Sequence, residues 1–324
     1  MKLLLLPFAL LTLFSSYPAQ AEWHKQEQAI MGTQVSVELW HEKPLQANKC
    51  ISLVMQNIHR IDAAMSPYKE QSELSRLNRT AANTPVKLSK ELFQLIEKAQ
   101  QVSEMTAGRF DITFASAGRF YDYRKGSRPA PDQLQSLVKA INYQHIQLDK
   151  QKRTVRFTHP QVAIDLGGIA KGHAVDQAIA ILKKCGIKNA LVSAGGDSRI
   201  LGDKQGLPWM TGIRHPRQKD SFAVVLPLTN TAISTSGDYE RFFMENGTRY
   251  HHILNPASGQ PATTARSVTI LGPDTTTTDA LSTSVFVMGP DQGMKLIESL
   301  SGFEAIIVDT EGQTHYTSGL LSPE

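Results

Sequence analysis

Three stretches of the chain carry hydrophobic residues at the spacing of amphipathic helices. The first covers residues 45–65, with apolar positions at Ile51, Met55, Ile58, Ile61 and Met65. The second begins after Ser89, a residue suited to an N-cap, and is expected to end by Gly108. The third follows a glycine-rich turn and places Val175, Ala178, Ile179 and Leu182 on one face, with Gly186 as its stop. Each pattern predicts a helix with one buried face.

Short apolar or alternating runs predict strands, most of them after residue 145, and two further helices are predicted at about 275–288 and 291–300. The polar stretch 66–85 reads as an irregular loop. We find no repeat, low-complexity segment or clear linker, so the sequence predicts an α+β chain folded as one intertwined domain, with mixed sheets and flanking helices. The predicted strands are 33–40, 145–149, 154–158, 161–164, 190–194, 198–202, 222–228, 232–236, 250–254, 267–271, 304–310 and 314–318.

The first 21 residues are excluded from this reading because they resemble a secretory signal peptide. Lys2 precedes an apolar run from Leu3 to Phe14, and Ala19-Gln20-Ala21 suits cleavage. The run is shorter than the roughly 20 residues that a spanning helix needs. No cysteine follows the cleavage site, so a lipid anchor is not indicated. We expect a cleaved signal peptide at 1–21, a mature domain at 22–324, and a periplasmic protein without stable membrane insertion.

Charge and cysteine content narrow the function classes. The leader holds one lysine and no acid, which leaves 33 basic and 30 acidic side chains in the mature chain. That small excess, without any basic run, does not favour a nucleic-acid partner. Cys50 and Cys185 are the only cysteines. They could pair in an oxidising compartment or remain buried thiols, and their spacing indicates no metal or redox site.

The turn "DLGGIAK" at 165–171 is the first candidate for chemistry. Gly167 and Gly168 allow close backbone approach, the next helix presents its N-terminus, and Lys171 adds a positive charge. This combination suits a phosphate or diphosphate, although paired glycines also make plain tight turns. A second Gly-Gly-Asp turn lies in "VSAGGDSRILG" at 192–202 and leaves the same two interpretations open.

The helix predicted at 275–288 offers a second candidate. Asp279 and Thr283 are one turn apart and share a face roughly opposite Leu281. A carboxylate and a hydroxyl are oxygen ligands of the kind that Mg²⁺ takes. The alternative is a carboxylate that complements the helix dipole beside a threonine bonded to its own backbone.

The histidine pair gives the third. His251 and His252 end a predicted strand, so at most one faces a given site, and a packing role is the alternative. The P-loop, Rossmann and zincin motifs are absent. "SPYK" at 66–69 matches the S-x-x-K of penicillin-recognising enzymes, but the companion K-T-G is missing.

Taken together, these segments resemble the ApbE-type flavin transferases, FAD:protein FMN transferases. The similar segments span nearly the whole mature chain: "MGT" (31–33), "SPYKEQSELSRLN" (66–78), "TAGRFDIT" (106–113), "IDLGGIAKGHAVD" (164–176), "NALVSAGGDSR" (189–199), "AISTSGDYERFF" (232–243), "YHHILNPASGQPA" (250–262) and "TDALSTSVFVMG" (278–289). The resemblance implies an ApbE-like, T-fold-related domain that uses Mg²⁺ and moves FMN from FAD onto a Ser or Thr hydroxyl of an acceptor protein, releasing AMP. Well-known members are often lipoproteins, and this leader lacks the acylatable cysteine.

The resemblance also implies a set of site residues. Mg²⁺ would be held by the Gly168 carbonyl, Asp279 and Thr283. Asp165 and Lys171 would contact FAD, with Lys171 reaching the diphosphate. The other positions that would line the flavin or adenine pocket are Met31, Tyr68, Arg109, Phe110, Asp111 and Ile253.

His252 is our choice for the proton acceptor, because the unperturbed pKa of histidine lies near neutrality. His251 and a carboxylate near the metal are the competitors. The glycine turn and the Asp279 helix should converge on one metal. The expected partners are flavin-carrying subunits of membrane electron-transfer complexes. An FAD pyrophosphatase that uses water as the nucleophile, and a non-catalytic periplasmic FAD-binding protein, are the alternative functions.

Overall fold

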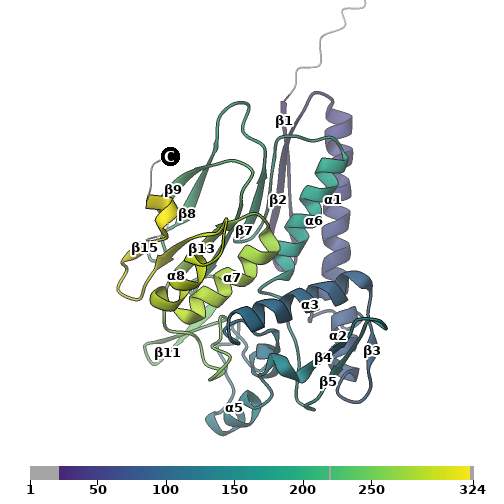
Figure 1. Cartoon of the computed structure of the whole chain (residues 1–324), viewed down its shortest axis with the longest axis vertical. Coiled ribbons are helices and arrows are strands. Elements are labelled where there is room, and N and C mark those ends of the chain that lie inside the picture. Colours follow the sequence, from purple (N-terminus) through teal and green to yellow (C-terminus); the bar gives the residue numbers. More distant parts are fainter. Residues whose placement is uncertain (1–21, 219, 322–324) are drawn as a thin grey trace, which may run out of the picture.

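An eight-stranded antiparallel sheet forms the centre of the computed structural model, which describes residues 22–218 and 220–321 (Figure 1). The predicted signal peptide therefore lies outside the described residues. In spatial order the strands are β1 (Glu22–Ile30), β2 (Thr33–His41), β6 (Ala190–Ala194), β7 (Asp197–Leu201), β10 (Ala232–Gly237), β13 (Ser267–Gly272), β14 (Glu304–Val308) and β15 (Thr314–Tyr316).

Four helices pack on one face of this sheet (Figure 1). They are α1 (Pro44–Met65), α6 (Ala170–Lys184), α7 (Thr275–Met288) and α8 (Pro290–Glu298). The apolar stripes of α1 and α6 meet alternate inward residues of β2 and β6, such as Val37 and Val192, in one core. The predicted α+β class and these helices are confirmed. Gly186 adopts φ +81° just after α6, as its predicted role as a stop requires.

The opposite face is covered by the hairpin of β8 (Trp209–Arg214) and β9 (Phe222–Leu228). Ile213 of β8 packs there against Ile233 and Ile306 of the large sheet. Two smaller sheets complete the strands: β3 (Val86–Lys87), β5 (Thr154–Phe157) and β4 (Ile146–Asp149), and the hairpin of β11 (Phe242–Glu245) and β12 (Thr248–His251). The remaining helices are α2 (Glu73–Thr80), α3 (Lys90–Met105), α4 (Ala115–Gly118), α5 (Pro131–Val138) and α9 (Ser318–Leu321). In the part of the chain that the structure describes, no helix is long and apolar enough to cross a bilayer.

Three predictions of local structure are wrong. The polar stretch 66–85 contains α2, which Ser72 begins by accepting a hydrogen bond from the Ser75 N–H at 2.9 Å. Only two leucines face inward there, which is too short a stripe to show as a periodic pattern. No strand forms at 161–164, where Gln161 is exposed and residues 162–164 are buried. The strand predicted at 250–254 is also too long, because β12 ends at His251.

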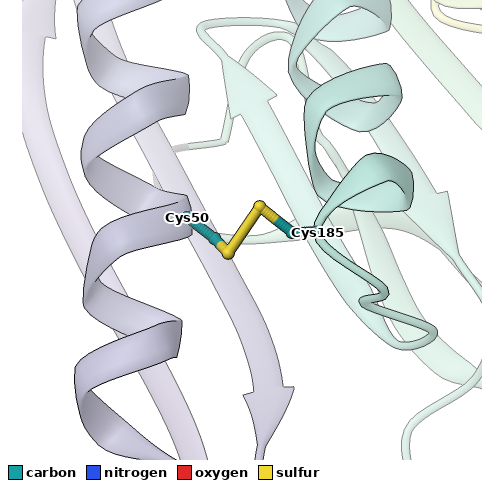
Figure 2. The surroundings of a disulfide bond; sticks show 2 residues. All are labelled: Cys50 and Cys185. Carbon is teal, nitrogen blue, oxygen red and sulfur yellow. A yellow bond between two sulfur atoms is a disulfide. The ribbon is translucent and has the colours of Figure 1, made fainter.

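A disulfide between Cys50 and Cys185 joins the second turn of α1 to the residue after α6 (Figure 2). Their Cα atoms lie 6.3 Å apart, and 135 positions separate them in the sequence. The sequence left their pairing open. The bond ties the N-terminal helix to the helix that follows the glycine turn.

We expect loss of this disulfide to lower stability without harming the site. Cross-linking so long a loop removes unfolded-state entropy worth about 5 kcal/mol in the chain-entropy model, and measured values are more often about 2–4 kcal/mol. Urea unfolding of the double variant Cys50→Ala/Cys185→Ala should show a loss in that range. The variant should be indifferent to added reductant, whereas the parent protein should weaken with it. Equal stability with and without reductant would contradict a structural role for the bond.

Candidate active site

The turn at 165–171 is held by side chains of distant segments. The Asn78 side chain accepts from the Ile164 N–H at 2.8 Å and donates to the Ile164 carbonyl at 2.9 Å. Ser116 Oγ accepts from the Ala163 N–H at 3.1 Å, and Asp165 N–H donates to the Ile112 carbonyl at 3.0 Å. These bonds replace the ladder that a strand would have used, which explains why the buried run stays irregular. They fix the start of the turn.

Helix α6 then begins at Ala170 and lies against the N-terminal half of α7. Gly172 makes this contact possible, because a Cβ there would lie 2.2 Å from the Thr275 carbonyl oxygen. The Gly172 N–H donates to Asp279 Oδ2 at 3.0 Å. The predicted convergence of the glycine turn and the Asp279 helix is therefore present.

Asp176, the last residue of the sequence "DLGGIAKGHAVD", anchors α7 from the side of α6. Its carboxylate accepts from the Thr275 N–H at 3.0 Å and from the Thr276 N–H at 2.8 Å, and it also pairs with Arg199. These bonds cap the first turn of α7 and so fix the position of Asp279, which lies one turn later in the same helix.

Lys171 lies between two carboxylates. Its Nζ donates to Asp197 Oδ2 at 2.5 Å and lies 3.3 Å from both oxygens of Asp279. Burial alone would lower the pKa of Lys171, but the charges of Asp197 and Asp279 outweigh it and raise that pKa. Burial, followed by repulsion from Asp197, raises the pKa of Asp279 to about 7. Two carboxylates surround one ammonium, so the cluster carries a net negative charge when both are ionised.

The residues assigned to Mg²⁺ fit a divalent cation. Thr283 Oγ1 lies 3.3 Å from the point that a Cβ on Gly168 would occupy, so the glycine turn and the α7 hydroxyl are neighbours. A carboxylate, a hydroxyl and a carbonyl are hard oxygen donors, and the surplus negative charge favours a cation. Across residues 22–218 and 220–321 no group of three or more His, Cys, Asp or Glu side chains could hold a metal. A cation here would accordingly depend on such mixed donors and water.

The two histidines differ in their surroundings. His251 is buried, its Nε2 lies 2.8 Å from the Ala262 carbonyl, and its ring packs against Phe286. Burial lowers the pKa of His251. His252 is half-buried, and its buried Nδ1 has no hydrogen-bond partner among the described residues. Burial, followed by the charge of Arg241, lowers the pKa of His252 to about 3. His252 is thus neutral at pH 7 with a free ring nitrogen, whereas His251 is committed to packing.

The lowered pKa of His252 predicts a loss of stability in acid. The unfolded chain binds a proton on this residue below about pH 6.5, whereas the folded chain does so only near pH 3. The free energy of unfolding should therefore be highest above pH 6.5 and fall as the pH drops towards 3. Urea unfolding at pH 7 and pH 5 should show this loss reduced by up to about 2 kcal/mol in His252→Gln. Identical losses in both proteins would contradict the buried neutral state.

The other predicted cofactor residues lie in several environments. The Phe110 ring packs on Gly168, since a Cβ there would lie 3.2 Å from it. Asp165 accepts from the Gly167 N–H at 2.6 Å, and burial raises the pKa of its carboxyl. Met31 has φ +55° in the two-residue turn between β1 and β2, unusual for a residue with a side chain. Together with Gly32 it lines an open pocket of about 570 Å³.

For three other predicted cofactor residues, all in the described part of the chain, the structure shows no contact with the glycine turn, and a fourth, Asp111, stabilises the fold. Tyr68 is 85% exposed, Arg109 is half-buried, and Ile253 is buried in the core around α7. Asp111 caps a short helical turn by accepting from Thr113, and its other oxygen accepts from the Tyr143 N–H at 2.7 Å. Both of its carboxylate oxygens are thereby used within the fold.

Comparison with known proteins identifies the family. The model of the ApbE family matches residues 31–307. The chain belongs to the ApbE family. The family predicted from the sequence is confirmed, and the match spans both the glycine turn and the Asp279 helix.

Two curated relatives of this ApbE chain share one name. The FAD:protein FMN transferase of Haemophilus influenzae is 34% identical over 78% of this chain and 76% of its own length. The protein of the same name from Treponema pallidum is 28% identical over 94% of this chain and 89% of its own length. Among solved structures, the ApbE protein of Thermotoga maritima is 33% identical, with a TM-score of 0.86 over 93% of this chain and 98% of that one. The predicted enzyme class agrees with these names.

Two residues of this ApbE site escaped the sequence reading. Asp197, which binds Lys171, follows the second Gly-Gly turn, between β6 and β7. Asp176 is the last residue of the segment 164–176, and the sequence indicated no role for it. The signal for Asp197 was present, because a Gly-Gly-Asp turn had been noted as compatible with close approach to a ligand. Nothing in the sequence indicated that it would pair with Lys171, which lies 26 positions away.

Proposed function

We propose that this protein transfers FMN from FAD to a Ser or Thr hydroxyl of an acceptor protein, with Mg²⁺ bound, and releases AMP. The names of the relatives support the reaction, and one geometric feature carries it. Gly168, Asp279 and Thr283 come together beside Lys171, from segments more than 100 positions apart. Plain folding of a tight turn does not require two buried carboxylates and an ammonium at that point.

The proposed chemistry is a displacement at phosphorus. The acceptor oxygen bonds to the FMN phosphorus, the bond from that phosphorus to the bridging oxygen breaks, and AMP leaves with that oxygen. Bound at Gly168, Asp279 and Thr283, Mg²⁺ would neutralise charge on the diphosphate. The neutral His252 ring can take the hydroxyl proton at its free Nδ1. Lys171 keeps Asp279 and Asp197 together by pairing with both.

The pKa of His252 near 3 makes it a weak base in the free protein. Two bound phosphates would bring negative charge beside the ring and raise that pKa towards neutrality, where a general base is most effective. Proton uptake by His252 is therefore expected to be coupled to dinucleotide binding.

Export to the periplasm by a cleaved leader is part of the proposal. The Cys50–Cys185 disulfide supports it, because such bonds form and persist in oxidising compartments. Acceptors that are subunits of membrane electron-transfer complexes would then meet the enzyme outside the cytoplasm.

The test is an intact-mass assay of the purified protein with FAD, Mg²⁺ and a flavin-acceptor domain. Transferase activity predicts that the acceptor gains the mass of one FMN and that AMP appears in equal amount, both abolished by EDTA. Free FMN and AMP without acceptor labelling would instead indicate the pyrophosphatase. Tight FAD binding without turnover, where a known transferase labels the same acceptor, would indicate a binding protein.

A further inference from the structure

The hairpin of β11 and β12 presents two site residues at its base. The register pairs Phe242 with His251, so the next residues outward, Arg241 and His252, lie opposite each other. The His252 N–H donates to the Arg241 carbonyl at 3.1 Å. The Arg241 backbone is therefore held beside that of His252, and Arg241 was not among the site residues predicted from the sequence.

The Arg241 guanidinium has no carboxylate partner in the described part of the chain. Its one hydrogen bond is a long contact of 3.5 Å from Nη2 to the Gly32 carbonyl, and the side chain is exposed. Its neighbours behave differently: Arg217 pairs with both oxygens of Asp238, and Arg249 lies 4.0 Å from the same carboxylate. Arg241 is thus a cation available for an anionic ligand.

Arg241 contacts the wall of the pocket beside Met31, and its charge also acts on residues of the proposed active site. It rests on Gly32, whose absent Cβ would lie 3.2 Å from Nη2, and Gly32 is part of the wall of the 570 Å³ pocket. Its charge also acts on two residues of the site: it adds to the effect of burial that lowers the pKa of His252, and it opposes the effect of burial that raises the pKa of Asp165. A ligand that extends from the pocket to the glycine turn would pass this guanidinium.

Lys171, the other cation at the turn, is already paired in this structure. Its ammonium is shared between Asp197 and Asp279, so its single positive charge is already neutralised by two carboxylates. A dinucleotide diphosphate carries two negative charges, and a single divalent ion beside two carboxylates leaves them incompletely balanced. A further cation near the turn would balance that charge, and a guanidinium binds phosphate oxygens in bidentate fashion.

We propose that Arg241 binds the diphosphate of FAD and holds the dinucleotide against the turn at 165–171. This inference rests on the proposed function, because it takes FAD as the ligand. It assigns to the β11–β12 hairpin the task of bringing the phosphate-binding cation and the proton-accepting histidine to the substrate together.

Calorimetric titration in EDTA, which prevents metal-dependent turnover, tests the inference by comparing FAD, ADP and riboflavin. Arg241→Gln should weaken binding of FAD and ADP by about 10- to 100-fold, and that of riboflavin, which has no phosphate, by less than about twofold. Arg241→Lys should recover part of the loss, since it keeps the charge but not the fork. The matched control is Arg156→Gln, which removes an exposed arginine on β5 and should bind all three ligands like the parent.

Two results would overturn the inference: equal weakening of FAD and riboflavin, which would indicate a merely structural role, or no weakening of any ligand. Its failure is separable from that of the proposed function. If the parent transfers FMN while Arg241→Gln binds FAD normally, only the inference falls. If the parent binds FAD without transfer and the variant loses phosphate ligands selectively, only the proposed function falls. A parent protein that binds neither FAD nor ADP would refute both.

Discussion

Replacing Asp279 with asparagine should reduce FMN transfer by at least about 100-fold while leaving the fold intact, because it removes the only carboxylate assigned to the metal. The side chain is 2% exposed and lies beside a second carboxylate, Asp197, whose repulsion helps to raise its pKa to about 7. An amide keeps the shape and can still accept from the Gly172 N–H. It also ends the repulsion with Asp197, so we expect the free energy of unfolding to change by no more than about 1 kcal/mol.

The same helix provides the matched contrast. Asp274 caps α7 by accepting from the Thr277 N–H at 2.8 Å and from its hydroxyl at 2.7 Å. Asp274→Ala should cost about 1 kcal/mol of stability and leave transfer within about threefold of the parent. Urea unfolding, Mg²⁺ titration calorimetry and the mass assay on both variants separate the two roles. An Asp279→Asn enzyme that still binds Mg²⁺ and transfers FMN would refute the metal assignment.

Much of the fold could be predicted because its helices are long enough to show a period. Helix α1 spans six turns, and α3 and α6 span four each, so their apolar stripes repeat several times. Helix α2 has eight residues and two inward leucines, which gives no repeat to detect. The run at 161–164 failed for another reason. Its apolar character predicted burial correctly, but its backbone is bonded by Asn78 and Ser116, and periodicity carries no information about such distant partners.

The site was predictable in its parts and less so in its connections. The oxygen ligands on α7 and the glycine turn could each also be explained as ordinary features of a helix and a tight turn. The prediction that they converge on one metal came from the family resemblance. The structure adds what neither could supply: Lys171 is paired with two carboxylates, and Arg241 is paired with none among the residues that the structure describes. Ion pairing depends on contacts between residues far apart in sequence, so a motif alone indicates which charges are present and not which ones are free.

We expect the methyl group added by Gly172→Ala to lower both the stability of the protein and its transfer activity. Alanine normally stabilises a helix relative to glycine by about 1 kcal/mol, so propensity alone predicts a more stable protein. Here the added Cβ would lie 2.2 Å from the Thr275 carbonyl oxygen and 2.9 Å from Asp279 Cβ. The first is a backbone atom and the second is bonded directly to the backbone, so neither can give way unless α7 moves. We expect a loss of about 3 kcal/mol in the free energy of unfolding, typical of severe overpacking.

The same displacement should lengthen the bond from Gly172 N–H to Asp279 and move Lys171 away from α7, so Mg²⁺ binding and transfer should both fall. Ala180→Gly, at a half-buried position on the same helix, measures the propensity effect by itself and should cost about 1 kcal/mol with normal transfer. Urea unfolding together with Mg²⁺ titration on the two variants decides the matter. If Gly172→Ala were as stable and active as the parent, α6 and α7 would not be held in the close contact on which the proposed metal site depends.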